Sequence, residues 1–250
     1  MVDRYAHVEA LIRDEPRASD DQPGMAGGLR RLCGAAGRAL AASGAGLTVM
    51  AAKGLRAVSA ASDPATGRLE ELQLTLGEGP CVEAYGLQRP VLVPDISDRT
   101  MTQWPVYAEA VHSLGVRAVF AFPLQIGAAR LGVMDVFRGW RGMLTPAQLS
   151  LALTFADVAV ATVLDGQRGL GRVGAGDGLG DPLGARAELF QAQGMVMVQL
   201  SVSLAEAMVR LRAYAFTHDQ RLADVAADVV ARRLVFSSDP QPPGTTNRLS

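Results

Sequence analysis

The chain is short of the residues that mark several classes of protein. Its 250 residues include two cysteines, Cys33 and Cys81, which are too few for a disulfide framework and fit a reducing cytoplasm. Aromatic residues make up 5%, and the formal net charge of −1 gives no bulk electrostatic attraction to nucleic acid. The N-terminus lacks the basic-then-apolar pattern of a signal peptide, and no uninterrupted apolar run could span a membrane. We therefore expect a cytoplasmic protein without a membrane anchor.

The sequence also lacks the usual signatures of catalysis and of cofactor binding. His7, His112 and His218 are scattered and show no metal-ligand spacing, so we expect no metal, haem, flavin or other cofactor. No Walker loop, nucleophile elbow or paired-carboxylate arrangement is present, which predicts that the protein is not an enzyme. Residues 169–174 match Gly-x-Gly-x-x-Gly, but a helical pattern precedes them and more glycine follows. They therefore indicate a linker and not a dinucleotide site.

What is present divides the chain into five parts. Residues 166–184 hold eight glycines in 19 positions, the composition of a flexible linker. We expect an N-terminal extension at 1–28 and a body at 29–165 before this linker. A helical module at 185–236 and a disordered tail at 237–250 follow it.

The body is typical of an α+β fold, an antiparallel sheet flanked by helices. Val116–Ile126 and Arg130–Phe137 are apolar strands separated by three small residues, which predicts a hairpin. Further strands are expected at 47–51, 55–60 and 90–94, and helices at 30–42 and 104–114. Thr145-Pro-Ala-Gln148 has the pattern of a capping box and predicts the start of a long helix. This helix is apolar on nearly every side over 149–164, which favours a homodimer interface, although packing on its own sheet is the alternative.

The C-terminal module reads as three short amphipathic helices. Ser203-Leu-Ala-Glu206 is a capping box that fixes the start of the second helix. Residues at three- and four-residue spacing then form one apolar stripe on each of the second and third helices: Leu204, Ala207, Met208, Leu211 and Ala215, and Leu222, Val225, Ala226 and Val229.

The residues of these helices resemble the ANTAR module, a small RNA-binding antitermination domain of bacterial regulators. The segments that carry the resemblance are Gln191–Met197, Glu206–Ala207 with Leu211–Ala215, and Arg221–Ala226. The resemblance implies contacts to RNA hairpins in nascent transcripts. We assign these contacts to residues of the matched motifs: Gln193, Gly194, Arg212, Tyr214 and Arg221. Gln193 stands where the family usually has lysine, which removes one cation. Residues 185–236 hold six arginines and five acids, so these arginines could instead be only a solvated face.

The body is similar to a GAF domain, and the order of the two modules is that of actinobacterial GAF–ANTAR regulators. Leu76–Cys81, Val91–Asp95, Gly115–Leu124 and Leu131–Asp135 carry this resemblance. It implies a pocket between the sheet and its covering helices for an unknown signal. The candidate lining residues are Cys81, Trp104, Phe120 and Phe122, although aromatics at strand spacing are more often core. Cys81 precedes a helix start, which suits a redox sensor, and the alternative is a small buried hydrophobe.

Together, these features predict a signal-responsive regulator that binds RNA stem-loops and promotes antitermination. The alternative is a protein–protein docking module whose helical bundle does not bind RNA. A DNA-binding helix-turn-helix is a third interpretation, but no helix shows the arginine, asparagine and glutamine cluster that reads base edges.

Overall fold

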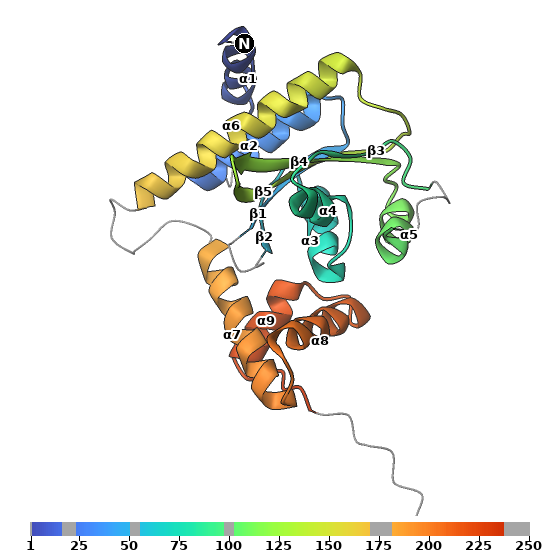
Figure 1. The fold of residues 1–250 in the computed structure, drawn as a ribbon, viewed down its shortest axis with the longest axis vertical. Helices are drawn as coiled ribbons and strands as arrows, with labels where there is room; N and C mark the ends of the chain where they lie inside the picture. Colours follow the sequence, from blue (N-terminus) through green and yellow to red (C-terminus); the bar gives the residue numbers. More distant parts are fainter. Residues whose placement is uncertain (1, 17–23, 51–55, 98–102, 171–181, 238–250) are drawn as a thin grey trace, which may run out of the picture. The chain divides into compact units, whose positions relative to one another are not determined.

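The computed structural model describes residues 2–16, 24–50, 56–97, 103–170 and 182–237. The chain divides into two compact units, Met1–Arg186 and Ala187–Ser250 (Figure 1). Most of the glycine-rich stretch expected to be a linker lies outside the described residues, as do the tail after 237 and the turn at Lys53-Gly54. Helix α6 runs to Leu170 and α7 begins at Pro182, so the described helices extend into both ends of that stretch.

Unit 1 is built on a five-stranded antiparallel sheet of order β2-β1-β5-β4-β3. The strands are β1 (Gly44–Met50), β2 (Arg56–Ala61), β3 (Val91–Val93), β4 (Ala118–Ile126) and β5 (Ala129–Arg138). The predicted hairpin is confirmed as β4 and β5. They are joined through Gly127, whose φ of 54° lies in the left-handed region that glycine tolerates.

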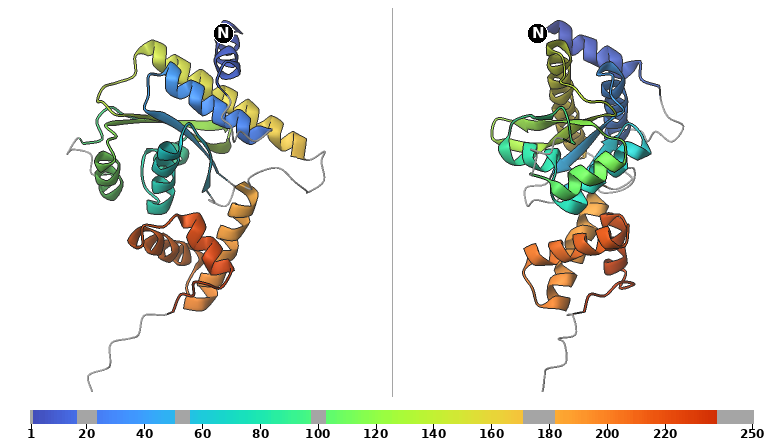
Figure 2. Two further views of the ribbon diagram at one scale, coloured as in Figure 1. Left: turned by 180° about the vertical axis from the view of Figure 1, so that it is seen from behind. Right: turned by 90° about the vertical axis from the view of Figure 1, so that its right-hand side faces the viewer.

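Helices α2 (Met25–Ala39) and α6 (Pro146–Leu170) cover one face of this sheet (Figure 2). Even-numbered residues of β4 and β5 point to this face because side chains alternate along a strand. Phe120, Phe122 and Met134 lie there with Phe155 of α6 in one core, and all four are fully buried. Helix α1 (Val2–Arg13) packs on α2 and α6 from outside, where Tyr5 donates a hydrogen bond to Asp157 at 2.8 Å.

The opposite face is covered by α3 (Pro64–Leu76), α4 (Pro80–Leu87) and α5 (Pro105–Ser113) (Figure 1). Odd-numbered residues of β4 and β5 point to this side. Val119 and Phe137 pack with Tyr107 of α5, and Ala121 and Val133 pack with Cys81 of α4 in a separate cluster. This face therefore has several small clusters where the other face has one continuous core.

Helix α6 begins with the predicted capping box. The amide of Gln148 donates to Oγ1 of Thr145 at 3.2 Å, and the amide of Thr145 donates to Oε1 of Gln148 at 3.0 Å. By length and composition α6 could cross a membrane, as could α7 and α8 taken together across a 103° bend. Helix α6 contacts β4, α2 and α1, which bury part of its apolar surface within one chain. Leu153 of the same helix is 42% exposed, so an apolar side chain is left on its outer surface.

Unit 2 contains the three predicted helices, α7 (Pro182–Leu200), α8 (Leu204–Thr217) and α9 (Leu222–Val230). Ser203 caps α8 as predicted, since its hydroxyl accepts a hydrogen bond from the Glu206 amide at 3.2 Å. Leu204 departs from the predicted stripe, because its side chain is 52% exposed. The core is made of small and branched apolar residues: Ala192, Val196, Ala207, Leu211, Ala215, Leu222, Val225, Ala226 and Val229.

A cap on α3 gives a stability prediction for unit 1. Oδ1 of Asp63 accepts from the Thr66 amide at 2.9 Å, and Oδ2 accepts from the hydroxyls of Thr66 and Ser62. Burial raises the pKa of this carboxyl, but the combined hydrogen bonds from Thr66 and Ser62 outweigh it and hold the pKa below its usual value. We predict that Asp63→Ala lowers the free energy of unfolding at pH 7 by about 0.5–2 kcal/mol.

The same cap predicts the pH dependence of that loss. A lowered folded pKa stabilises the protein above the unfolded value of about 3.9, and this contribution disappears as the pH falls through the folded pKa. Asp63→Asn keeps the cap but removes the titrating group. Denaturant unfolding of the parent and both variants between neutral and acidic pH measures this. Equal stability of parent and Asp63→Ala at pH 7 would contradict it.

Candidate functional site

Unit 2 has a groove along α8 that combines aromatic and cationic side chains. Arg210, Ala213, Tyr214 and Thr217 share one helix face by their three- and four-residue spacing. The α8 groove has a volume of about 600 Å³, and its lining is Leu200, Val202, Arg210, Ala213, Tyr214, Thr217, Phe236 and Ser237. The Phe236 amide donates to Oε1 of Gln199 at 2.9 Å, which holds the C-terminal segment against α7.

Tyr214 lies at the centre of an aromatic group in this groove. Its ring stacks on that of His218 with centroids 3.9 Å apart and planes at 15°, and it meets Phe236 edge-on at 5.5 Å. One face of Tyr214 is therefore already covered by His218, which is itself exposed. A base that stacked here would meet a surface made of more than one ring.

The structure places the five predicted RNA contacts in different environments. The Gln193 side chain is half-buried and donates to the Leu204 carbonyl at 2.7 Å, so it also ties α7 to the start of α8. Gly194 lines a second groove of about 500 Å³, the Gly194 groove, formed with Gln191, Met195, Val198, Gln199, Arg232 and Val235. Arg212 is half-buried, whereas Arg221 is exposed where α9 begins. Tyr214 alone of the five lines the α8 groove.

Sequence reasoning did not select Arg210, His218 or Phe236. Arg210 stands four residues before Tyr214, and His218 four residues after it, so helical spacing could have placed all three on one face. Arg210 lies 3.9 Å from Glu206 on the helix surface, with both side chains about half exposed (51% and 50%). Such a pair is weak enough to yield to a phosphate. Phe236 gave no local signal, because its position depends on the tertiary fold.

In unit 1, the segment from Leu76 to Cys81 links the helices that cover one face of the sheet, α3, α4 and α5. Gly77 ends α3 in the left-handed conformation with φ 71°, and Gly79 precedes α4 with φ 126°. Oε1 of Glu78 accepts hydrogen bonds from the amides of Val106 and Tyr107 at 3.0 and 2.8 Å, which fixes the first turn of α5. One short segment thus connects and orients three helices.

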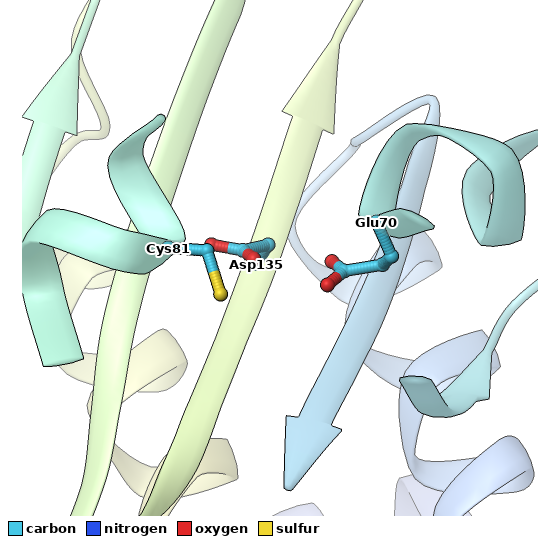
Figure 3. Close-up of side chains that lie close together, drawn as sticks. All are labelled: Glu70, Cys81 and Asp135. Carbon is cyan, nitrogen blue, oxygen red and sulfur yellow. The ribbon is translucent and has the colours of Figure 1, made fainter. Parts of the chain in front are cut away.

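The same segment delivers Cys81 to a fully buried polar cluster. The Cys81 amide donates to Oε1 of Gln73 at 2.8 Å, and Nε2 of Gln73 donates to Oδ2 of Asp135 at 3.1 Å. Glu70 of α3 accepts from the Thr48 hydroxyl at 2.7 Å. The acidic cluster (Glu70, Cys81 and Asp135) comes from α3, α4 and β5, and the three side chains converge in Figure 3.

Burial changes the acidity of this cluster. Burial, partly opposed by hydrogen bonds from Glu70, Cys81 and Gln73, raises the pKa of Asp135 to about 6. Burial and the nearby charge of Asp135 raise the pKa of Glu70 well above its usual value. These buried carboxyl groups differ from the aromatic lining that the sequence predicted for this domain.

The four predicted pocket residues do not form one pocket. Phe120 and Phe122 belong to the core under α2 and α6, on the opposite face of the sheet from Cys81 and Trp104. Cys81 and Trp104 in turn belong to separate clusters on the face covered by α3–α5. The prediction of a shared lining is therefore corrected. Phe120 and Phe122 point to one face of the sheet, whereas Cys81 of α4 and Trp104, which precedes α5, lie on the other.

Comparison with known families agrees with both units. The GAF domain profile matches residues 28–163, more than half of the chain. The chain belongs to the GAF domain family. The ANTAR domain profile matches residues 179–230, and α7–α9 form its helical bundle. A GAF sensor joined to an ANTAR domain is the arrangement of a signal-responsive regulator, and neither domain is a catalytic one.

Solved structures share the GAF fold at low sequence identity. The GAF domain of an Acinetobacter phosphoenolpyruvate-protein phosphotransferase is 12% identical, with a TM-score of 0.51 over 69% of this chain and 97% of that chain. The corresponding domain from Coxiella burnetii is 14% identical, with a TM-score of 0.50 over 69% and 96%. Free methionine-R-sulfoxide reductase from Neisseria meningitidis is 13% identical, with a TM-score of 0.48 over 66% and 89%. No curated protein matches the sequence.

In the GAF domain, strand β1 and helix α3 approach closely at Gly46, and this contact predicts the effect of adding a methyl group there. Gly46 of β1 pairs with Asp135 of β5, and a Cβ on Gly46 would lie 2.5 Å from Cγ and Oε1 of Glu70. We predict that Gly46→Ala lowers the free energy of unfolding by about 1–3 kcal/mol, since the buried Glu70 has nowhere to move. Chemical denaturation of the variant measures this.

The matched control is Gly86→Ala in α4, where an added Cβ would meet no atom within 4 Å. There, the lost freedom of the unfolded chain should raise stability by about 0.4–1 kcal/mol. Equal effects of the two alanines would mean that the space beside Glu70 is not restricted.

Proposed function

We propose that this protein is a cytoplasmic, non-catalytic regulator that binds RNA stem-loops through its ANTAR domain and promotes antitermination. The GAF domain receives the signal. The observation that carries the proposal is the α8 groove, where Arg210 lies beside the aromatic group of Tyr214, His218 and Phe236. Splayed bases of RNA loops are recognised by stacking on aromatic and arginine side chains, which does not require a strongly basic domain.

The low net charge of the domain favours loop recognition over helix recognition. A protein that tracks a duplex backbone neutralises many phosphates with lysine and arginine. Residues 185–236 have six arginines against five acids, and Arg233 is held by Asp228 at 2.7 Å. We therefore expect base stacking, supported by a few arginines, to supply most of the affinity for RNA. Among the predicted contacts, the exposed Arg221 and the half-buried Arg212 stay candidates for phosphate.

A docking module is the second candidate function, and the Gly194 groove favours it. Val198 and Val235 line this groove and are 71% and 63% exposed. Apolar side chains of that size on a domain surface are typical of contacts with another protein. This candidate takes the place of RNA binding if the full-length chain binds no structured RNA.

For RNA binding we predict that Tyr214→Ala weakens the affinity of the full-length chain for a hairpin by about tenfold or more. Base–aromatic stacking contributes roughly 1–3 kcal/mol per base. Tyr214→Phe keeps the ring and should bind like the parent, which separates stacking from loss of the fold. Fluorescence anisotropy with a labelled hairpin measures the affinity, after circular dichroism has established that each variant is folded.

The contribution of each arginine to hairpin binding is measured from the dependence of the affinity on salt concentration. Arg210→Ala, Arg212→Ala and Arg221→Ala should each flatten the slope of log affinity against log salt by about one phosphate contact. Gln193→Lys should steepen it, since lysine adds a cation where the family usually has one. Arg141→Ala makes the same charge change in unit 1, where Arg141 pairs with Asp95, and should leave the slope unchanged. If all variants match the parent, these residues do not form the RNA site.

We also propose that the protein acts as a homodimer, because two ANTAR domains would raise the effective affinity for paired hairpins. The exposed Leu153 of α6 is a candidate contact between two copies. Light scattering on the full-length chain is expected to give twice the 26.3 kDa of one copy. A monomer at micromolar concentration would contradict it, and would leave RNA binding to a single ANTAR domain.

A further inference from the structure

Among the described residues of the GAF domain, four buried side-chain oxygens lack hydrogen-bond partners. One belongs to the half-buried Gln125, and the other three belong to fully buried side chains. These three are Oε1 of Glu70, Oδ1 of Asp135 and the hydroxyl of Tyr107, and all three side chains are 0% exposed. An orphaned buried oxygen costs about 1–3 kcal/mol, so these carboxyl groups are stabilised either by a proton that Glu70 and Asp135 share or by a bound cation.

Two of these oxygens belong to carboxyl groups that lie beside a thiol. The carboxylate oxygens of Glu70 and Asp135 and Sγ of Cys81 lie within 4.8 Å of one another. The Tyr107 hydroxyl, contributed by a fourth element, α5, has its pKa raised by burial and by the charges of Asp135, Glu70 and Cys81. It donates to no described residue.

The charges of this cluster are not balanced by the protein. Among the described residues, no ion pair forms with Glu70 or Asp135. Arg138, three residues after Asp135 in β5, is an even-numbered residue and donates to the Leu40 carbonyl beside α2. Two carboxyl groups and a thiol without a cation are costly to ionise in a dry interior.

We propose that Glu70, Cys81 and Asp135 bind a divalent transition-metal ion. A metal ion would deprotonate the Cys81 thiol and both carboxyl groups, and it would supply the missing positive charge. A set of one sulfur and two oxygen ligands favours a zinc-like transition metal over magnesium or calcium, which take oxygen ligands only. Three protein ligands leave a coordination position open, as in metal sites that exchange a water or a small ligand.

The fold is built to hold these ligands. Gly46 leaves room for the Glu70 carboxylate beside Asp135, and Thr48 and Gln73 hydrogen-bond the remaining oxygens, Oε2 and Oδ2. Partners of this kind orient ligating carboxylates and raise metal affinity. No ligand spacing is visible in the sequence, because the three residues come from separate elements and meet only through the packing of α3 and α4 on β5. The expectation of no metal stays untested, and this proposal is its alternative, which does not depend on RNA binding.

The test uses the full-length chain, purified without a tag and analysed by elemental mass spectrometry. We expect one transition-metal ion per chain. Stripped protein titrated with Co²⁺ should develop a thiolate-to-cobalt charge-transfer band in the near ultraviolet and should unfold at a higher temperature. Asp135→Asn and Glu70→Gln should weaken binding at least tenfold, since each removes a negatively charged ligand.

The two cysteines form a matched control pair. Cys33 is also fully buried but lies in the core under α2 and α6, away from Cys81. Cys33→Ala should keep the cobalt band, because only Cys81 is then left to give it, whereas Cys81→Ala should lose it. Even if Cys81→Ala does not fold, the result for Cys33→Ala shows whether Cys81 gives the cobalt band.

Two results would overturn the proposal. One is a parent protein that carries no metal and responds to Co²⁺ with neither a band nor a rise in unfolding temperature. In that case Glu70 and Asp135 share a proton, and Glu70→Gln should then be at least as stable as the parent. The other is loss of the band in Cys33→Ala, which would place the thiolate ligand elsewhere.

Discussion

The close approach of helix α3 to strand β1 is the constraint on which the GAF domain depends. It requires that β1 carry no side chain at Gly44 and Gly46, because a Cβ there would run into Thr66 and Glu70 respectively. The approach brings the Asp63 cap, the Glu70 carboxylate and Gln73 against the sheet. Oε1 of Gln73 accepts a hydrogen bond from the Cys81 amide, which fixes the start of α4. The packing of α3 on this face of the sheet therefore depends on glycine at positions 44 and 46.

This constraint also explains why the two faces of the sheet differ in character. The face under α2 and α6 is one apolar core, and its stability comes from burial. The face under α3–α5 buries Thr48, Glu70, Gln73 and Asp135, whose hydrogen bonds must be satisfied together or cost stability. A polar face of this kind is poorly suited to hold a fold by itself. It is well suited to respond to a bound ion, since the charge of an ion would change the interactions of the buried carboxyl groups.

The ANTAR domain is arranged differently, because its chemistry lies on the surface. Its core is made of alanine, valine and leucine, which lets α8 and α9 pack closely and leaves the larger side chains outside. Tyr214 and Phe236 come from separate segments, and their contact with His218 makes an aromatic surface that no single helix provides. The proposed readout of RNA loops rests on this surface and not on net charge.

Local signals in the sequence were reliable, whereas signals that depend on packing were not. The capping box at Thr145, the Ser203 N-cap and the β4–β5 hairpin are short-range patterns, and all three are confirmed. Helix α3 was not predicted, because its buried positions include Thr66, Glu70 and Gln73 and so give no apolar stripe.

The predicted site residues show the same limit. Phe120 and Phe122 were grouped with Cys81, although strand alternation puts them on the other face once the register is known. Arg210 and His218 share a helix face with Tyr214, so spacing alone could have found them. Phe236 and the acidic cluster depend on contacts between distant segments, which no pattern in the chain encodes.

The central claim is that this regulator recognises RNA loops through α8, and cross-linking tests it most directly. The full-length protein would be cross-linked to RNA in cells, and the linked peptides and RNA fragments would be identified by mass spectrometry and sequencing. The account predicts fragments that fold into hairpins, linked at their loops to the peptide spanning Arg210 to His218 or to Phe236. Recovery of no structured RNA, or links confined to the GAF domain, would contradict it.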